Sequence, residues 1–337
     1  MADRFLDLDR TTRSEILQAL TNKLPLAPAV IEKDIWVCWA LAALFTMPGR
    51  VQMAFKGGTS LSKVYHAIHR FSEDVDVTLD YRALAPGVDP FDKTMSRSKV
   101  KKLAAELKER VKQHAVEVVV PHFDRLIGNE SNREGMGVQC DDAGEKIWIK
   151  YESVVSKQTA CVADSILIEL GGRNITEPSE RHSLVPFATP HVKDLEWPIA
   201  TVDVLSPKRT FWEKATLIHA ECNRGELKAA PERLSRHWYD LAMLADHAIG
   251  EDAIADRALL DSVVAHKEAF FHAAHARYRD CLHGKMRLVP EKPMAGELRK
   301  DFQAMLDAGM FDQEPPSFDT ILARLSDLAQ RINAAAT

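Results

Sequence analysis

The sequence predicts an α+β protein in which a mixed sheet flanked by helices is followed by a bundle of helices. Residues 73–80 alternate between polar and apolar, the period of a half-buried strand. Further strand-like runs lie at 53–56, 146–152, 162–170 and 200–205. From residue 206 onward the apolar residues recur mainly at helical spacing. We therefore predict an N-terminal mixed-sheet domain over 1–205 and a C-terminal helical domain over 206–337.

The helices are predicted from the same periodicity. In the first half they cover 10–47, 60–68 and 96–123, and in the second half 207–223, 232–248, 251–280, 295–308 and 317–335. The pair Ser206-Pro207 is a typical helix start, because proline needs no amide partner in a first turn. A polar, glycine-containing stretch at 129–144 predicts a loop or hairpin.

Composition and charge narrow the class of protein. The chain has 337 residues, of which 46% are hydrophobic and 28% charged, an ordinary globular balance. Its net charge of −5 argues against a basic coat for nucleic acid but leaves room for a local basic patch. Five cysteines stand singly, so neither a zinc site nor a disulfide framework is indicated. The longest apolar stretch, 35–47, is too short to span a bilayer, and no secretory signal begins the chain, so we expect a cytoplasmic protein without a membrane partner.

The segment around Gly57 and Gly58 predicts a phosphate site. A strand ends at these glycines, which let the backbone approach a ligand closely. A helix is predicted to follow, with Thr59 as its cap, and the amides and dipole of a helix start favour an anion. Thr59 and Ser60 add hydroxyl donors. Taken alone, a Gly-Gly pair is usually only a turn.

The chain then returns as the alternating strand that carries Asp74 and Asp76. Their spacing of two places both carboxylates on one face. Hard oxygen ligands side by side suit Mg²⁺, which fills its coordination shell with substrate phosphates. An Asp-x-Asp pair alone is often only the solvent face of a strand. A phosphate site followed by a carboxylate pair, however, is the layout for transfer of a phosphorus centre. The P-loop and dinucleotide-binding motifs are absent from the sequence.

These motifs resemble the first motif of the DNA polymerase beta-like nucleotidyltransferase superfamily, which is Gly-Gly, a helix, and Asp-hydrophobic-Asp. Gly-Gly-Thr-Ser-Leu-Ser-Lys at 57–63 and Arg-Phe-Ser-Glu-Asp-Val-Asp at 70–76 are similar to the AbiEii/AbiGii branch. That branch contains toxins of bacterial toxin–antitoxin and phage-defence systems. Supporting stretches lie at 31–37, 211–214 and 236–241, so the resemblance spans about residues 30 to 245.

The resemblance implies an enzyme that transfers a nucleoside monophosphate from a nucleoside triphosphate to an acceptor and releases pyrophosphate. One or two Mg²⁺ ions would be held by Asp74, Asp76 and a third carboxylate, Glu169, which could equally be an exposed strand position. Either Asp76 or Glu169 would deprotonate the acceptor hydroxyl. The nucleotide-binding residues would be Gly57, Gly58, Thr59, Ser60, Lys63 and Lys214. Lys63 could reach a phosphate or could be a surface lysine.

Lys214 and Asp240 extend the expected site into the helical domain. The resemblance implies that Lys214 contacts the triphosphate, so the helical domain would contribute to the active site. Asp240 lies among Trp238, Tyr239 and Leu241, and a carboxylate in such apolar surroundings needs a partner. It could pair with Lys214 or Arg236, or could act as a base on the acceptor, and we count it with Lys214 among the catalytic candidates.

The segment 97–112 predicts a helix with a positive stripe that could follow an RNA backbone, although a solvated helix face would look the same. The candidate RNA-binding residues are Lys99, Lys101, Lys102, Lys108 and Arg110. The resemblance implies an RNA acceptor, in particular the 3′ end of transfer RNA, and a cognate antitoxin protein as a partner. Two alternatives stay open: transfer to a protein or small molecule, such as the antitoxin itself, and a carboxylate-metal nuclease.

Overall fold

The computed structural model describes residues 3–72, 74–92, 94–155, 164–227 and 231–336. Its contacts divide the chain into two compact units. Unit 1 comprises Met1–Val64, Ser72–Val88 and Ala105–Val204, and unit 2 comprises Tyr65–Phe71, Asp89–Ala104 and Leu205–Thr337. Two short segments of the predicted N-terminal domain, 65–71 and 89–104, therefore belong to unit 2.

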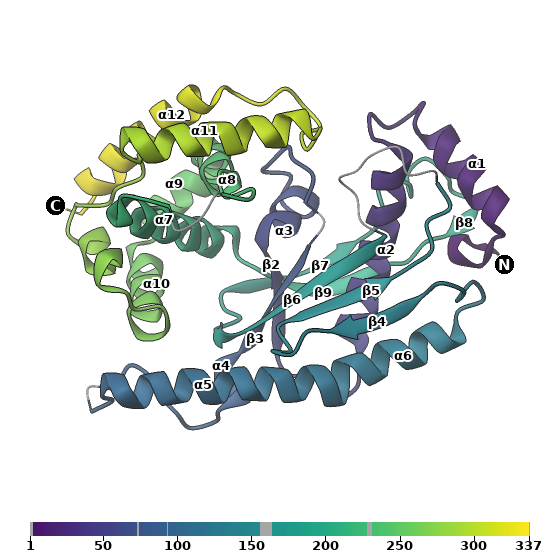
Figure 1. The fold of residues 1–337 in the computed structure, drawn as a ribbon, viewed down its shortest axis with the longest axis horizontal. Helices are drawn as coiled ribbons and strands as arrows, with labels where there is room; N and C mark the ends of the chain where they lie inside the picture. The colour runs from purple at the N-terminus through teal and green to yellow at the C-terminus, as the bar shows by residue number, and fades with distance from the viewer. Residues whose placement is uncertain (1–2, 73, 93, 156–163, 228–230, 337) are drawn as a thin grey trace. The chain divides into compact units, whose positions relative to one another are not determined.

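Unit 1 is built on a mixed β-sheet (Figure 1). Its described strands are β2 (Met53–Lys56), β3 (Val75–Asp80), β4 (Gly137–Cys140), β5 (Lys146–Lys150), β6 (Ser165–Asn174), β7 (Ser179–Leu184) and β9 (Ala200–Leu205). The strand order in this seven-stranded sheet is β4-β5-β6-β3-β2-β9-β7. β3 pairs antiparallel with β2 and parallel with β6, while β2 and β9 are parallel. A short parallel pair joins β1 (Asp3–Arg4) and β8 (Leu195–Glu196). The α+β class with a mixed sheet is thus confirmed.

The strand predictions succeed where apolar residues alternate and fail where they do not. The predicted strands at 53–56, 73–80, 146–152, 162–170 and 200–205 correspond to β2, β3, β5, β6 and β9, except that residues 73, 162 and 163 lie outside the described residues. The polar stretch at 129–144 contains β4, which pairs with β5 as the predicted hairpin alternative. β7 was not predicted, because in the sequence Ser-Glu-Arg-His-Ser-Leu only Leu184 is buried. The sheet supplies the pairing that this polar segment does not indicate by itself.

The helices of unit 1 lie at its N-terminus and around the sheet. They are α1 (Arg10–Leu20), α2 (Pro28–Thr46), α3 (Gly57–Lys63), α4 (Tyr81–Leu84) and α6 (Val120–Asn129), with a short 3₁₀ turn at Phe5–Asp7. The predicted helix at 10–47 is divided in two, because the segment before α2 contains Pro25 and α2 itself begins with Pro28. The predicted helix at 60–68 begins earlier, at Gly57, and ends at Lys63.

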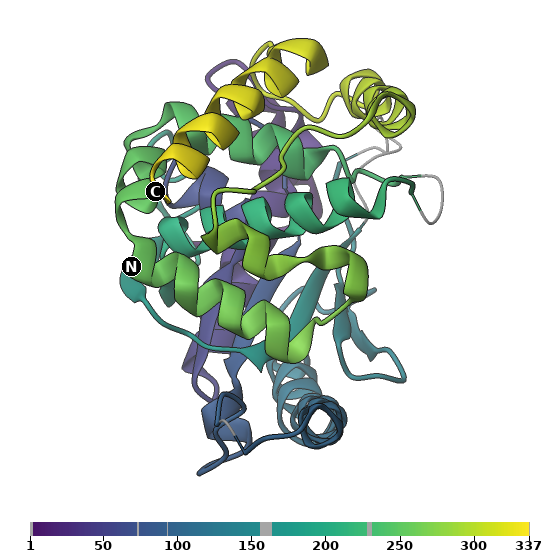
Figure 2. The ribbon, with the colours of Figure 1, turned by 90° about the vertical axis from the view of Figure 1, so that its left-hand side faces the viewer.

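The predicted helix at 96–123 is a continuous rod that runs further, to Asn129 (Figure 1). It consists of α5 (Arg97–His114), one π-helical turn at Ala115–Val119 and α6, and Figure 2 shows it end-on. The wider π turn stands directly before Pro121, which has no amide to continue the α-helical pattern. A Cβ on Gly172 of β6 would lie 2.3 Å from the side chain of Val111, so α5 packs closely on this face of the sheet. The charged residues Asp76 of β3 and Glu169 of β6 therefore lie on the opposite face of the sheet.

Unit 2 is mainly helical. Its helices are α7 (Pro207–Arg224), α8 (Arg236–Asp246), α9 (Ala248–Ala255), α10 (Arg257–Phe270), α11 (Lys292–Asp307) and α12 (Phe318–Ala334), with 3₁₀ turns at Ala274–Ala276 and Tyr278–Leu282. Trp212 and Trp238 are fully buried in this unit. The predicted helix at 251–280 is wrong beyond Phe270, and it is also interrupted at Asp256. The Asp256 carboxylate accepts the Leu259 N–H and so starts a new helix.

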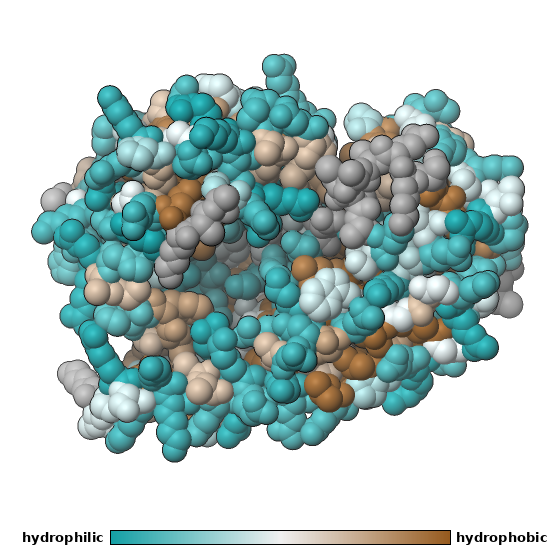
Figure 3. Space-filling view, viewed as in Figure 1, coloured by the Kyte–Doolittle hydropathy of each residue, from teal (hydrophilic) through white to brown (hydrophobic). Residues whose placement is uncertain are grey.

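The large hydrophobic residues that are exposed include Phe91, Val116, Val185, Ile199, Phe271 and Val289. Hydrophilic side chains predominate on the face drawn in Figure 3. No helix in the described part of the chain is long and apolar enough to cross a membrane. The described cysteines, Cys38, Cys140, Cys222 and Cys281, are free thiols, and Cys161 lies outside the described residues.

Candidate active site

Asp74 precedes β3 directly and Asp76 is its second residue. Both aspartates are partly exposed, whereas Val75 and Val77 are buried, so the two carboxylates face the same side of the sheet. Further along β3, the polar residues on the same face are buried. Asp80 is fully buried and accepts hydrogen bonds from the Thr176 hydroxyl and from Arg82. Only the beginning of β3 therefore presents carboxylates to a ligand.

A row of charged residues crosses four neighbouring strands at this point. Asp76 is paired in register with Lys56 on β2 and with Glu169 on β6, and Glu169 is paired with Lys146 on β5. The Lys146 Nζ lies 3.2 Å from the Glu169 Oε1. Two carboxylates thus lie side by side between two lysines, and the flanking positive charges offset their mutual repulsion. Glu169 is both half-exposed and next to Asp76, so the two alternatives considered for it are compatible.

The position of the Asp76 carboxylate requires a glycine at residue 57. Its φ of +82° lies in the left-handed region, which favours glycine. A Cβ at Gly57 would lie only 2.0 Å from the Asp76 Oδ2, so the carboxylate occupies the space that any side chain would need. The Gly-Gly turn and the Asp-x-Asp strand are therefore one packed unit.

Replacing Gly57 by alanine is expected to reduce catalytic turnover by about 100-fold, because displacing a reacting group by about 1 Å has an effect of this size. Gly87→Ala is a matched control, since Gly87 has a similar φ of +78° but nothing within 4 Å of an added Cβ. Both variants carry the same backbone strain, about 1 kcal/mol or somewhat more. Turnover and unfolding free energy would be measured for both. Equal turnover in the two variants would contradict the role assigned to this contact.

Thr59 and Ser60 use their hydroxyl groups inside the unit. The Thr59 Oγ1 lies 2.6 Å from the Asp74 carbonyl oxygen and 3.1 Å from that of Ser72. The Ser60 Oγ donates to the Gly57 carbonyl oxygen over 2.9 Å. Neither side chain caps α3, so the predicted capping role of Thr59 is wrong. Thr59 instead ties α3 to the start of β3, which positions Asp74. Gly58 lies buried in the first turn of α3.

Lys63 is a buried lysine, so the surface alternative is wrong. Its ammonium group forms an ion pair with Asp34 of α2 and lies 4.1 Å from the centre of the Phe187 ring. Burial alone would lower the pKa of Lys63, but Asp34 and the nearby Cys38 raise it above its ordinary value. The Asp34 Oδ2 also accepts the Phe187 N–H over 2.7 Å. The stretch 31–37 thus anchors α3 from behind.

In unit 2 the predicted partner of Asp240 is confirmed as Lys214, and a second partner is Arg70. The Lys214 Nζ lies 2.8 Å from the Asp240 Oδ2, and Arg70 donates to both carboxylate oxygens over 2.6 and 2.8 Å. Asp240 is fully buried, which would raise its pKa, but the two cations hold the pKa well below its usual range. A carboxylate with so low a pKa is a poor base, so this geometry favours the ion-pair alternative.

Arg70 was not singled out from the sequence, although it is the first residue of the 70–76 motif. It lies 170 residues from Asp240, and no periodicity links the two. The Lys214 Nζ also lies 3.4 Å from the His237 Nδ1. Burial lowers the pKa of Lys214, and burial together with Lys214 and Arg236 lowers that of His237 well below its usual value. One carboxylate thus serves two cations, and the neutral His237 adds no charge. A lysine that shares its carboxylate partner with an arginine can also bind an anion.

Acid should destabilise the chain through two histidines, the buried His219 and the partly buried His237. Burial lowers the pKa of His219 and His237 in the folded state. Between those values and about 6.5, the ordinary pKa, the unfolded chain binds protons that the folded chain does not, so stability rises with pH and is lost on acidification. The expected loss is at most about 1.4 kcal/mol per pH unit for each histidine. Urea unfolding between pH 7.5 and 5.5 measures it. His219→Gln and His237→Gln should each flatten the dependence, and an unchanged slope in both would refute the assignment.

The candidate RNA-binding residues of α5 separate into two groups. Lys99, Lys101 and Lys102 are exposed, and none has a carboxylate within ion-pair distance among the described residues. Lys108, in contrast, lies 3.5 Å from Glu145, and the Arg110 guanidinium donates to the Leu84 carbonyl oxygen. The cations that remain available are therefore those of the first half of α5.

The residues fit a magnesium site of two carboxylates. Asp74 and Asp76 offer hard oxygen donors on one face. Mg²⁺ is commonly bound by one or two protein carboxylates together with substrate phosphates. Among the described side chains there is no group of three possible metal ligands, and the Glu169 carboxylate forms an ion pair with Lys146. Glu169 remains a predicted third ligand.

Comparison with known proteins defines the class of the chain. The sequence profile of the family described as "Nucleotidyl transferase AbiEii toxin, Type IV TA system" matches residues 39–324. The chain is therefore a nucleotidyl transferase, a class that uses a nucleoside triphosphate. It belongs to the AbiEii toxin family of type IV toxin–antitoxin systems, which implies a cognate antitoxin and confirms the resemblance found in the motifs.

The chain was also compared with solved structures and with curated proteins. Among solved structures, MenT4, a nucleotidyltransferase toxin from Mycobacterium tuberculosis H37Rv, aligns with 98% of this chain and 98% of its own at 16% identity and a TM-score of 0.45. A search among curated proteins finds no match.

Proposed function

We propose that the chain transfers a nucleoside monophosphate from a nucleoside triphosphate to the 3′ end of transfer RNA, using Asp74 and Asp76 as its metal-binding carboxylates. The observation that carries this proposal is the Asp76 carboxylate, which lies over the Cα of Gly57 and in register with Glu169. A backbone turn that a ligand can approach closely and a carboxylate pair are thereby held together. This is the combination that transfer at phosphorus requires.

Magnesium, when bound by Asp74 and Asp76, supplies charge neutralisation at the attacking and leaving oxygens. The chain's own residues position the reactants. Thr59 fixes the start of β3 through its bond to the Asp74 carbonyl oxygen, and Gly57 leaves room for the Asp76 carboxylate. We propose Glu169 as a further metal ligand, which requires that its carboxylate leave Lys146.

The reaction is an in-line displacement at the α-phosphorus. The acceptor hydroxyl oxygen forms the new P–O bond, and the bond from the α-phosphorus to the bridging oxygen breaks. Pyrophosphate leaves with that electron pair, and the hydroxyl proton passes to Asp76 or Glu169, which lie side by side in the row. The low pKa of Asp240 argues against its acting as this base.

Triphosphate binding is proposed for the cationic and glycine-containing residues. Lys214 suits this role because its ammonium group shares the Asp240 carboxylate with Arg70 and is not matched by a counterion of its own in this pair of contacts. The Gly57-Gly58 turn offers backbone N–H groups, since the first amides of a helix have no partner within it. The hydroxyls of Thr59 and Ser60 and the ammonium of Lys63 are already bonded within unit 1, so their contribution is the shape of the turn.

The RNA acceptor is proposed from the first half of α5. Lys99, Lys101 and Lys102 form a solvent-facing cluster without carboxylate partners among the described residues. Lysines of this kind release counterions from a phosphate backbone, and they give a protein with a net charge of −5 a local site for nucleic acid.

The test is a labelling assay. The purified chain is incubated with Mg²⁺, one of four α-labelled nucleoside triphosphates, and total bacterial RNA or purified transfer RNA. We expect label in a transfer-RNA band. Digestion of the last nucleotide should remove this label. Label in protein would select the alternative acceptor, and cleavage of RNA without any triphosphate would select a nuclease. Either of these outcomes, without labelled RNA, overturns the proposal.

A further inference from the structure

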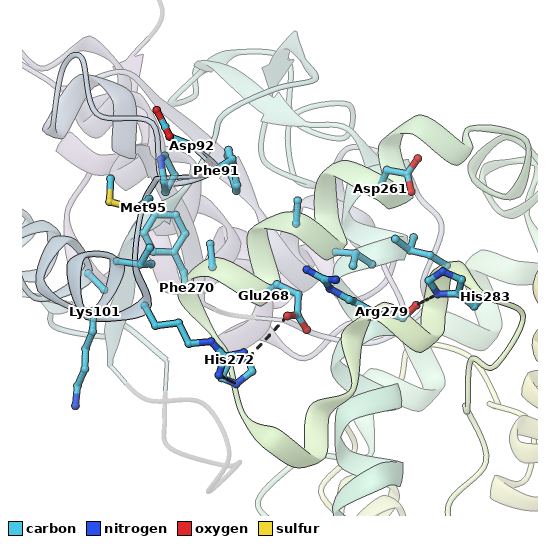
Figure 4. A pocket seen from close by; sticks show the side chains of 18 residues that line it. Phe91, Asp92, Met95, Lys101, Asp261, Glu268, Phe270, His272, Arg279 and His283 are labelled. Carbon is cyan, nitrogen blue, oxygen red and sulfur yellow. Dashed lines mark hydrogen bonds and ion pairs between the residues drawn. The ribbon is translucent and has the colours of Figure 1, made fainter.

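Unit 2 contains a pocket of about 840 Å³ that the proposed reaction does not use (Figure 4). One wall comes from described residues of 90–104, including the start of α5, and the other from residues 261–283 of α10 and the 3₁₀ turns that follow. The volume lies in the range of pockets that bind small molecules or cofactors, so a single nucleotide fits inside.

The base of the pocket is apolar and aromatic. Val264, Phe270 and Val100 line it and are buried. Phe91 also lines the pocket but is 43% exposed, and its ring centre lies 5.1 Å from that of His266. The exposed part of the Phe91 ring is apolar surface in contact with water, and a flat ligand bound in the pocket would cover it. A nucleobase is such a partner, because every base can stack on an aromatic ring.

The polar groups of the pocket include both signs of charge. Arg279 has no ion-pair partner among the described residues, and its side chain points into the pocket in Figure 4. The Arg97 Nη1 lies 2.9 Å from the His272 Nε2, and the other ring nitrogen of His272 lies 3.8 Å from Glu268. Asp261 adds a further carboxylate. A bare anion would be repelled by these carboxylates, whereas a nucleotide offers phosphate to the arginines and base amino groups to the carboxylates.

The pocket is also continuous with the cationic cluster of α5. Arg97, Val100 and Lys101 line the pocket, while Lys99 and Lys102 project from the same turns of the helix into solvent. A nucleic-acid backbone held by these lysines would pass the mouth of the pocket. Stacking of splayed, unpaired bases on aromatic side chains is the usual way in which proteins read single-stranded RNA.

We propose that this pocket binds one unpaired nucleotide of the RNA acceptor, with the base against Phe91 and the phosphate on Arg279 and Arg97. The inference rests on the proposed RNA acceptor and adds a second point of attachment, separate from the carboxylates of β3. It predicts that the chain distinguishes RNA with a single-stranded end from fully paired RNA.

The experiment compares two labelled hairpin RNAs with the same duplex, one blunt and one with a four-nucleotide 3′ overhang. Their dissociation constants are measured by fluorescence anisotropy with the full chain and without nucleoside triphosphate. The parent is expected to bind the overhang about tenfold more tightly, a factor typical of one stacked base. Phe91→Ala and Arg279→Ala should bring the two affinities to within about twofold.

Phe271→Ala and Lys285→Ala serve as matched controls. Phe271 is 39% exposed and Lys285 is exposed, but neither lines the pocket, so both variants should keep the tenfold preference. A parent without preference, or a preference that survives in Phe91→Ala and Arg279→Ala, would overturn the inference. If transfer RNA is labelled in the transfer assay but Phe91→Ala and Arg279→Ala keep the preference for the overhang, the proposed function stands and only the role of the pocket is wrong. Absence of labelled RNA in the transfer assay would remove the proposed function on independent grounds.

Discussion

Asp74→Asn and Asp76→Asn are each expected to reduce nucleotide transfer by about a thousandfold, with little change in the stability of the fold. Asparagine keeps the size of the side chain but removes the charge that holds a metal ion and balances the transferring phosphate. Removing one electrostatic contact to a transition state commonly slows a reaction by about 100- to 1,000-fold. Both aspartates are partly exposed, so the amide that replaces each carboxylate can be hydrated. Single-turnover transfer of labelled nucleotide measures the effect.

The matched control for these variants is Asp203→Asn on β9. Asp203 is also a partly exposed strand carboxylate, and it pairs with Arg181 at 3.1 Å on the surface. Its loss should change transfer by no more than about twofold, since exposed ion pairs contribute about 1 kcal/mol or less. If Asp74→Asn and Asp76→Asn both kept more than a tenth of the parental rate, the assignment of the catalytic carboxylates would be wrong.

The largest effect on stability is expected from Asp240→Asn. Asp240 is fully buried, and its replacement removes the carboxylate that Arg70 and Lys214 share in the core. Breaking a buried ion pair from one side typically costs about 3–5 kcal/mol. The unfolding free energy from urea titration at neutral pH should fall by about this amount. Transfer should fall as well, because Lys214 would lose the partner that positions its ammonium group.

Asp246→Asn on the same helix separates burial from simple loss of charge. Asp246 lies 2.6 Å from Arg324, but its side chain is 52% exposed. Its replacement should cost less than about 1 kcal/mol, as for other solvated pairs. Equal losses of stability in Asp240→Asn and Asp246→Asn would show that the buried cluster has no special role.

Local patterns in the sequence predicted the elements that carry most of the candidate site residues. The alternation around Asp74 and Asp76 needs only the two-residue period of a strand, and that period also placed Glu169 on β6. The C-terminal helices were found because their apolar residues recur at helical spacing. Thr59 was misjudged, since its hydroxyl has two local options, a helix cap or a bond to the chain before β3. Only the packing of α3 against β3 decided between them.

The contacts that hold the candidate site required the tertiary structure. Arg70 and Asp240 stand 170 residues apart, and Lys63 meets Asp34 across 29 residues. Charged residues of this kind look like surface residues in a sequence, because burial of a charge depends on a partner that folding brings to it. The pocket beside Phe91 likewise joins residues near 90–104 to residues near 261–283.

The sequence by itself determined the class of fold and the family and predicted the carboxylates for a metal, because these depend on short motifs and on the periods of strands and helices. The tertiary structure decided which of those residues are exposed, which are neutralised and which are held in place. Asp76 beside Gly57 and Asp240 between Arg70 and Lys214 differ in role for one physical reason. The first carboxylate is partly exposed to solvent, whereas burial commits the second to the cations that surround it.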